Sequence, residues 1–346
     1  MMKNFSRNLL FRILIFLKIV LGKKICRKIV FFLTRGEEFA YLESLYCPET
    51  NKAESVGYVL LPGPCSWGKC TMCGFQQAVK EFTQDIPFSG KNLALMFQLG
   101  LQLISGPRKI MIFTGGSFLD LPLTAQKKIL TSLKDDASCR HILIESRAEL
   151  ISLEKIMALK KQLGPKQLEV AIGLETQDDE IRQKCINKGF SRADYQKAVK
   201  VLKAQDVLVS TYVFLKPVGV NERLAIAEAI KTIEFAFQSG SDSVGLESAF
   251  VQPGTKMAVI YEQGMYQPPW LWSIIEVLKK THHLGPIQIG NFENEYPLPL
   301  AVPKNCPRCS AAIYKQLKNY RQMPDLNLLS NLTCACKKEW LEKCNI

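Results

Sequence analysis

The sequence predicts an α/β fold built on a parallel sheet that is arranged as a barrel or partial barrel. From about residue 55 onward, short apolar runs alternate with longer helical patterns, and this alternation is typical of βαβ units with right-handed crossovers. Polar residues follow most of the apolar runs. Because ligands bind at the carboxyl ends of strands in parallel α/β folds, these polar residues predict one shared binding edge.

Six short apolar segments have the composition of buried strands. They are 57–61, 109–114, 141–145, 168–174, 208–215 and 243–246. The longer segments between them place apolar residues at helical spacing. These predicted helices are 93–104, 123–133, 153–162, 193–204 and 224–238. A chain of 346 residues can hold one large domain with appendages.

The charge of the chain is concentrated at its two ends. Residues 1–36 contain nine Lys or Arg and no acid, residues 302–346 contain eight basic and three acidic residues, and the rest is nearly neutral. We therefore expect a basic amphipathic extension over 1–40, the barrel over 41–285 and a basic C-terminal region over 286–346. Basic ends favour a polyanion such as RNA or an acidic membrane surface; the alternative is that they are solvated without a partner.

The first basic segment also contains an apolar run. Arg12 and Lys18 interrupt this run over 9–21, so it is a poor bilayer span. It is compatible with a helix packed on the barrel, an interfacial membrane helix or a targeting segment. The twelve cysteines cluster and no convincing secretory cleavage site is seen. We therefore predict a reducing, cytoplasmic compartment, with membrane-peripheral contact through 1–36 as an open alternative.

Three cysteines in one short loop are the strongest chemical signal. Cys65, Cys70 and Cys73 are separated by gaps of four and two residues, and thiolates at this spacing can turn toward one iron or zinc centre. Iron–sulfur clusters usually have four cysteine ligands, so three would leave one iron open to a small molecule. The alternatives are a plant-type two-iron cluster completed by the distant Cys139, a zinc ion with three thiolates and water, or unliganded thiols.

The cysteine loop resembles that of the radical S-adenosylmethionine (radical SAM) superfamily, over roughly residues 55–285. The usual gaps in that superfamily are three and two, whereas this chain has four and two. The resemblance implies a partial (β/α)6 barrel and a [4Fe–4S] cluster held by Cys65, Cys70 and Cys73. It further implies that SAM binds the open iron and is reductively cleaved to a 5′-deoxyadenosyl radical.

Three further motifs match the superfamily. Thr114-Gly-Gly-Ser-Phe118 resembles the glycine motif that receives the SAM amino group. Glu145-Ser-Arg147, and Gly173-Leu-Glu-Thr176 together with Ile186-Asn-Lys-Gly189, resemble the Elongator catalytic-subunit branch. The resemblance implies that SAM is bound by Gly115, Gly116, Ser117, Ser146, Arg147 and Glu175. The alternative role of the last three is helix capping and surface pairing.

A closer resemblance is to the archaeosine-biosynthesis radical SAM proteins. It rests on Cys70-Thr-Met-Cys-Gly74, Phe214-Leu-Lys-Pro217, Val251-Gln-Pro-Gly-Thr255 and a cysteine-bearing tail. The resemblance implies an enzyme that modifies a tRNA base in archaeosine-type 7-deazaguanine chemistry. Its implied partners are tRNA, a reductant such as flavodoxin or ferredoxin, and a partner enzyme subunit. The alternative function is a non-catalytic iron–sulfur electron-transfer or RNA-binding protein.

The C-terminal region contains a second group of cysteines. Cys306 and Cys309 form one pair, and Cys334 and Cys336 form another after 24 intervening residues. Four thiolates are compatible with a structural zinc ion or with a second iron–sulfur cluster; the alternative is a helical tail without metal. The other cysteines are predicted to be core or surface thiols: Cys26, Cys47, Cys139, Cys185 and Cys344. The three histidines do not suggest hydrolytic catalysis.

Overall fold

The computed structural model describes residues 40–47, 52–83, 89–104, 106–291 and 298–345. Eight strands in this part of the chain form one sheet whose spatial order follows the sequence. Their bounds are β1 Ala40–Cys47, β2 Lys52–Leu60, β3 Lys109–Phe113, β4 His141–Ser146, β5 Gln167–Glu175, β6 Leu208–Leu215, β7 Ser243–Ser248 and β8 Ile287–Ile289. Only β1 and β2 pair antiparallel; every later pair is parallel. The result is the predicted α/β partial barrel.

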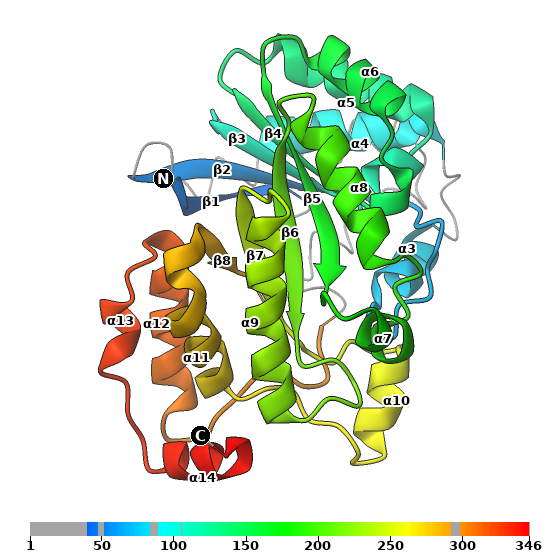
Figure 1. Ribbon diagram of the computed structural model, residues 1–346. Helices are drawn as coiled ribbons and strands as arrows, with labels where there is room; N and C mark the ends of the chain where they lie inside the picture. The colour runs from blue at the N-terminus through cyan, green and yellow to red at the C-terminus, as the bar shows by residue number, and fades with distance from the viewer. Residues whose placement is uncertain (1–39, 48–51, 84–88, 105, 292–297, 346) are drawn as a thin grey trace.

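Helices cover the outer face of this half-barrel (Figure 1). Their bounds are α3 Phe75–Thr83, α4 Gly90–Leu103, α5 Leu123–Asp135, α6 Leu153–Leu163, α7 Asp179–Ile181, α8 Arg192–Lys203, α9 Glu222–Gln238, α10 Lys256–Glu262, α11 Leu271–Thr281, α12 Ser310–Gln322, α13 Asn327–Ser330 and α14 Cys336–Cys344. A π-helical turn, Arg182–Ile186, directly follows α7. Figure 1 shows α3, α7 and α10 grouped at the end of the sheet to which β5 points.

Local capping explains where several of these helices begin. The side chains of Ser89, Ser152, Asn221 and Thr255 each accept a hydrogen bond from a backbone N–H in the first turn of the helix that follows. Such a cap satisfies one of the N–H groups that a helix start leaves without a partner, which stabilises the helix by about 1 kcal/mol. Ser191 goes further, because it forms a reciprocal capping box with the first turn of α8.

The strand sequences alternate so that their apolar side chains face the helix layer. Ile110 and Ile112 of β3, and Ile142 and Ile144 of β4, are fully buried in one core cluster with α5, α6 and α8. Outward-facing residues of β6 and β7 form a second cluster with α9, α11 and α12. Each fully buried aliphatic side chain contributes roughly 1.5–3 kcal/mol to stability. The inner face carries the charged residues described next and a smaller apolar cluster around Tyr58.

A buried ion cluster occupies the inner face near the amino ends of the strands. Lys109 Nζ lies 2.5 Å from Glu169 Oε2, and His141 Nε2 lies 2.7 Å from the same oxygen. Burial disfavours the charged Glu169 carboxylate, but Lys109 and His141 outweigh this effect and lower the pKa of Glu169 to about 2. The cluster therefore ties three neighbouring strands together at the base of the half-barrel.

The tail closes the side of the sheet that its curvature leaves open. Helix α12 contacts both β1 and β8, the two edge strands, and Arg321 Nη2 lies 3.2 Å from Glu43 Oε2 on β1. In Figure 1, α12 and α13 stand beside α11, next to β8. Edge strands covered in this way cannot pair with another chain.

Most predicted elements are present, with two additions at the sheet edges. All six predicted strands and five predicted helices appear, β6 with the predicted bounds and the others with shifted ones, whereas β1 and β8 were not predicted. Residues 1–39 of the predicted basic amphipathic extension lie outside the described residues, and Ala40 begins β1. Among the helices of the described ranges, none is both long enough and apolar enough to cross a bilayer.

Candidate active site at the mouth of the half-barrel

The cysteine loop follows β2 at the carboxyl end of the sheet, which forms the mouth of the half-barrel. Cys65, Cys70 and Cys73 are free, half-buried thiols. Burial raises the pKa of Cys70 and raises that of Cys73 to about 11. Thiolates in such surroundings need a cationic partner, and a metal centre supplies one.

Backbone contacts tie this loop to the segment after β5. The N–H of Thr71 donates to the carbonyl of Ile186 at 2.9 Å, and the Thr71 hydroxyl donates to the carbonyl of Cys185 at 2.6 Å. The N–H of Met257, in α10, donates to the Thr71 carbonyl at 3.0 Å. Asn187, in the left-handed conformation with φ of 56°, donates its side-chain amide to the carbonyl of Lys69 at 2.9 Å. The loop is therefore held between two elements far away in the sequence.

The glycine motif after β3 lies directly against the cysteine loop. Gln76 Oε1 accepts from the N–H of Cys65 at 3.2 Å, and Gln76 Nε2 donates to the carbonyl of Gly115 at 2.8 Å. A Cβ on Gly116 would lie 2.1 Å from the carbonyl oxygen of Pro64. Only glycine permits this approach, so the glycine pair and the cysteine loop form one surface.

The predicted polar residues after β3 and β4 also meet. The Ser117 hydroxyl donates to Ser146 Oγ at 3.2 Å, and both side chains are buried. Arg147 Nε lies 2.5 Å from Glu149 Oε1, and Arg147 Nη2 donates to the carbonyl of Lys188 at 2.6 Å. These contacts orient Arg147 at the mouth.

Glu175 ends β5 in a backbone conformation that residues other than glycine rarely adopt. Its φ is 66°, and its carboxylate lies 2.5 Å from Lys188 Nζ. Burial opposes the charge on Lys188, but Glu175 and then Cys70 outweigh it and raise the pKa of the lysine. Because Arg147 contacts the carbonyl of Lys188 and Glu175 contacts its ammonium group, Lys188 joins the two predicted residues.

Comparison with known proteins gives a consistent result. Residues 61–230 match the radical SAM superfamily. The archaeosine synthase subunit beta of Methanosarcina acetivorans is 34% identical over 80% of this chain and 81% of its own length. The protein of the same name from Thermococcus kodakarensis is 32% identical over 78% of this chain and 84% of its own length.

The chain belongs to the radical SAM superfamily. Its fold agrees with this membership: the structure of Methanocaldococcus infernus Elp3 with an N-terminal deletion aligns with a TM-score of 0.51, at 19% identity, over 66% of this chain and 60% of that one. The radical SAM domain and the enzyme relatives make this protein an enzyme, as predicted, rather than a non-catalytic carrier.

The residues at the mouth fit the cluster and SAM that the radical SAM superfamily implies. Gln252 Oε1 accepts from the N–H of Gly74 at 2.8 Å, which turns the Gln252 Nε2 group away from Gly74. That nitrogen is buried and has no hydrogen-bond partner in the described ranges. A buried donor without an acceptor costs about 1–3 kcal/mol. An acceptor supplied by a bound group near the Cys73–Gly74 turn would remove that cost.

The thiols of Cys185 and Cys139, two possible fourth ligands, make other contacts. The carbonyl of Cys185 contacts the loop through Thr71. Its thiol lies beside Gly219 instead, with Sγ 3.7 Å from the position that a Cβ on Gly219 would take. The Cys139 thiol donates to the carbonyl of His141 at 3.4 Å, and His141 begins β4 at the opposite end of the sheet. The loop therefore offers three thiols rather than four.

Between the mouth and the base, the inner face carries a second polar layer. Glu145, Tyr212 and Glu247 are half-buried at inward-facing positions of β4, β6 and β7. Burial, reinforced by Glu247 and opposed by a hydrogen bond from Tyr212, raises the pKa of Glu145 to about 8. Glu145 directly precedes Ser146 on β4, so this polar layer begins next to the carboxyl end of the sheet.

The four tail cysteines also come together. Sγ atoms of Cys306 and Cys309 lie 3.6 Å apart, those of Cys306 and Cys334 lie 3.5 Å apart, and those of Cys309 and Cys336 lie 3.6 Å apart. All four sulfurs fall within 4.8 Å of one another. Among the described cysteines, the others predicted to be core or surface thiols do not join such a group, and Cys26 lies outside the described residues.

Three residues that contact the predicted site were not predicted as site residues. Lys188 and Gln252 lie in motifs that carry the family resemblance, so their motifs were a usable signal. Gln76 stands three residues after Cys73 and has no such motif. Its position became evident only from its two hydrogen bonds.

Proposed function

We propose that this enzyme reductively cleaves SAM at a [4Fe–4S] cluster to modify a tRNA base, in archaeosine-type 7-deazaguanine chemistry. The observation that carries the proposal is the set of three thiols in one anchored loop, with Cys185 and Cys139 aimed elsewhere. When bound, the cluster and SAM supply a 5′-deoxyadenosyl radical that abstracts hydrogen from the substrate. The relatives named archaeosine synthase subunit beta support the choice of substrate.

The residues of the mouth have separate roles in this proposal. Cys65, Cys70 and Cys73 would hold the cluster, and Gln252 would donate a hydrogen bond toward it. Gly115, Gly116 and Ser117 would form the wall that receives the SAM amino group. Ser146, Arg147 and Glu175, the last two positioned by Lys188, would complete the SAM pocket. The surrounding barrel orients the substrate and excludes solvent.

Anaerobic reconstitution tests the cofactor half of the proposal. We expect about four irons at the loop and release of 5′-deoxyadenosine from SAM after reduction. A Cys70→Ala variant should lose both, whereas Cys185→Ala should keep both because its thiol faces Gly219. A loop that binds no iron, or loss of cleavage in both variants alike, contradicts the ligand assignment.

Mass spectrometry of tRNA nucleosides tests the substrate half. Cells that lack this protein should accumulate a 7-deazaguanine precursor in tRNA and lose the modified product. Restoring the wild-type chain should reverse this change, and restoring the Cys70→Ala variant should not. An unchanged nucleoside profile would leave the radical SAM chemistry in place and remove tRNA as its substrate.

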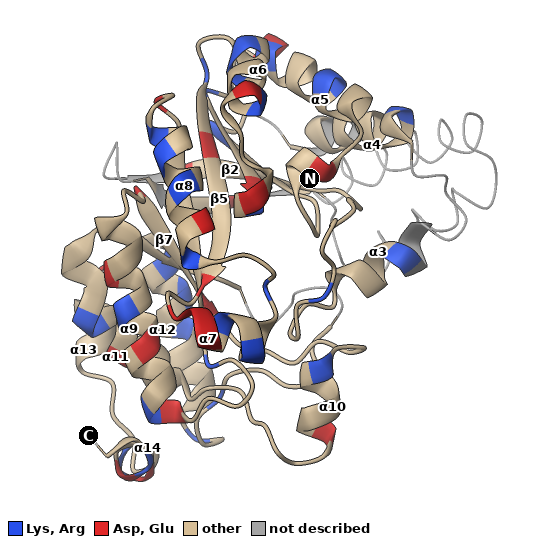
Figure 2. Ribbon diagram, turned by 45° about the vertical axis from the view of Figure 1, so that its right-hand side comes forward, with Lys and Arg blue, Asp and Glu red and all other residues tan. Residues whose placement is uncertain are grey.

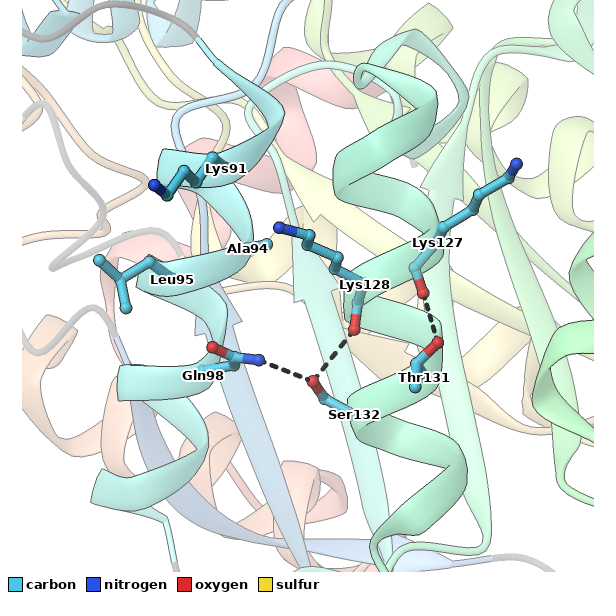
Figure 3. A pocket seen from close by; sticks show the side chains of 8 residues that line it. All are labelled: Lys91, Ala94, Leu95, Gln98, Lys127, Lys128, Thr131 and Ser132. Atoms are coloured by element: carbon cyan, nitrogen blue, oxygen red, sulfur yellow. Dashed lines mark hydrogen bonds between the residues drawn. The ribbon is translucent and has the colours of Figure 1, made fainter.

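A groove between α4 and α5 supports contact with a nucleic acid. The groove has a volume of about 480 Å³, and Lys91, Lys127 and Lys128 line it with Thr131 and Ser132 (Figure 3). Its lining contains no acidic side chain. Further basic residues lie on α5 and α6 (Figure 2). Three exposed lysines around a concave surface suit the phosphates of a tRNA backbone, and we expect binding that weakens steeply with salt.

Charge reversal tests this surface. Changing Lys91, Lys127 and Lys128 together to Glu should weaken tRNA binding at least tenfold and should reduce the slope of log affinity against log salt by roughly 2–3. The matched control reverses three exposed lysines of α8 and α9: Lys197, Lys200 and Lys231. Equal losses in the two triple variants would show that net charge, and not the groove, governs affinity.

The proposed partners follow from the relatives and from the chemistry. Because the relatives are named subunit beta, we propose that a second enzyme subunit works with this chain. Reductive cleavage needs an electron donor, such as flavodoxin or ferredoxin.

We also propose a second metal at the four tail thiols, either zinc or a second iron–sulfur cluster. Membrane contact through 1–36 stays a prediction.

A further inference from the structure

The spacing of the four tail sulfurs distinguishes between the two metals that the sequence leaves open. A tetrahedral ion bound to four thiolates at about 2.3 Å holds every pair of sulfurs roughly 3.8 Å apart. In a [4Fe–4S] cluster each thiolate is bound to a different iron, so the protein sulfurs lie roughly 6 Å apart. A two-iron cluster separates its two ligand pairs by a similar distance. The tail sulfurs, all within 4.8 Å of one another, match the single ion.

The backbone around these sulfurs is already arranged as a ligand turn. The N–H groups of Cys309 and Ser310 both donate to the carbonyl of Cys306 at 3.1 Å, which brings the first pair of thiols to one side. On the other side, the N–H of Lys337 donates to the carbonyl of Cys334 at 2.9 Å. The indole N–H of Trp272 donates to Cys336 Sγ at 3.5 Å. Such donors stabilise a ligating thiolate.

The thiols are located where one ion would join two helices. Cys309 directly precedes α12, and Cys336 is the first residue of α14. An ion between them would close the loop that contains α12 and α13. Loop closure by a metal removes conformational entropy from the unfolded chain, so it stabilises the closed form.

Both helices make contacts that reach the barrel. Helix α12 covers the open side of the sheet between β1 and β8. In α14, the indole N–H of Trp340 donates to Ser273 Oγ at 2.9 Å, and the Ser273 hydroxyl donates to Glu222 Oε1 at 2.5 Å. Glu222 Oε2 lies 2.5 Å from Nζ of Lys216, which follows β6 at the mouth. Fixing α14 therefore also fixes the ion pair at the end of β6.

We propose that Cys306, Cys309, Cys334 and Cys336 bind one tetrahedral divalent ion of the Zn²⁺ class, which clamps α12 and α14 onto the half-barrel. Binding replaces the thiol protons, which are released to solvent, and involves no change in oxidation state. The ion is structural because all four ligands come from the protein and none is left for a substrate. The proposal does not depend on the reaction at the mouth.

Metal analysis of the anaerobically prepared full chain tests the identity of the ion. We expect about one zinc and four irons per chain. Titrating the wild-type protein with a mercurial thiol reagent should release one zinc as the tail thiols react. Co²⁺ added to the zinc-free protein should give the intense visible spectrum of a tetrahedral thiolate site, and one equivalent of Zn²⁺ should abolish it. About eight irons and no zinc, or no metal besides the loop iron, overturns the proposal.

Variants separate the tail from the mouth. Cys334→Ser with Cys336→Ser should lose the zinc and keep the loop iron, whereas Cys70→Ala should lose the iron and keep the zinc. Cys344→Ser, in the same helix as Cys336, is the matched control and should keep both. If the double variant does not fold, the mercurial release from the wild-type chain still decides whether the ion is present.

Hydrogen exchange tests the clamp itself. Removing zinc from the wild-type chain should raise exchange in α12, α14 and β1 at least tenfold while the amides of β4 and β5 stay protected. Labelling of Lys216 by an amine-reactive probe should also rise. Its partner Glu222 accepts from Ser273, and Ser273 loses its hydrogen bond from Trp340 when α14 moves. Loss of the ion with unchanged exchange in α12 and α14 would contradict a clamping role.

Discussion

At the scale of single residues, the inner face of the sheet contains two glutamates whose pKa values are shifted by their surroundings. Glu169 is buried between Lys109 and His141, while Glu145 lies further along the strands, beside Tyr212 and Glu247. The first carboxylate has a pKa lowered to about 2, and the second has a pKa raised to about 8. The pKa values of these two carboxylates move in opposite directions, because Lys109 and His141 outweigh burial at Glu169, whereas burial dominates at Glu145.

Replacing Glu169 by Gln should destabilise the protein by about 3 kcal/mol at pH 7. The folded pKa of Glu169 lies below its unfolded value, so its stabilisation is present above pH 5 and is lost as the pH falls toward 2. The difference in unfolding free energy between wild type and variant should therefore shrink below pH 4.5. Urea unfolding at pH 7 and pH 3.5 measures it. Glu180→Gln, an exposed control, should change stability by under about 0.5 kcal/mol.

Gly116 offers a second residue-scale prediction. A Cβ at this position would lie 2.1 Å from the Pro64 carbonyl oxygen, so Gly116→Ala must displace the cysteine loop. We expect reconstituted iron to fall by half or more and SAM affinity to fall about tenfold. Gly264→Ala, which meets nothing within 4 Å, should lose about 1 kcal/mol of stability to its positive φ and keep its iron. Full iron loading of Gly116→Ala would refute the prediction.

At the scale of elements, the segment after β5 supports the cysteine loop. The π-helical turn Arg182–Ile186 ends at Asn187 in the left-handed conformation. That geometry presents the carbonyls of Cys185 and Ile186 to Thr71, and the carbonyl of Asn187 to the indole of Trp67 at 2.6 Å. The mouth is therefore built by a turn that ends one helix and not by the sheet alone.

Two substitutions at Asn187 should separate its conformation from its side chain. Asn187→Gly keeps the left-handed backbone and loses only the bond to Lys69, so we expect a loss of about 1 kcal/mol or less. Asn187→Ala loses the same bond and adds strain of about 1–2 kcal/mol. Chemical denaturation and iron retention in air should both rank wild type above Gly and Gly above Ala. The reverse order of the two variants would exclude backbone strain as the cause.

At the scale of the whole molecule, the C-terminal region covers the side of the half-barrel that the sheet leaves open. Helix α12 covers the edge strands, and residues of α12, α13 and α14 share a core with β6, β7 and β8. This arrangement links the C-terminal region to β1, close to the beginning of the described chain. The stability of the tail and that of the sheet edges should consequently be coupled.

The ion pair between Arg321 and Glu43 measures this coupling. The two side chains are 17% and 26% exposed, so we expect a coupling free energy of about 0.5–1 kcal/mol. A double-mutant cycle with Arg321→Ala and Glu43→Ala, followed by chemical denaturation, gives the value. The pair Lys184 and Glu180, exposed on one turn, is the control and should give less. Additive single effects at Arg321 and Glu43 would show that the contact contributes nothing.

The sequence alone determined the strand–helix alternation, because buried strands and amphipathic helices carry their periodicity in the order of their residues. It also determined the three-thiol loop and the four tail cysteines, because ligand spacing is local. The edge strands β1 and β8 could be identified only from their pairing in the sheet. The three residues of β8, for example, are a strand because they pair with β7. Lys188, Gln76 and Gln252 were placed by contacts between distant segments, and so was the closeness of the tail sulfurs. Such contacts depend on how the whole chain packs, which no local pattern encodes.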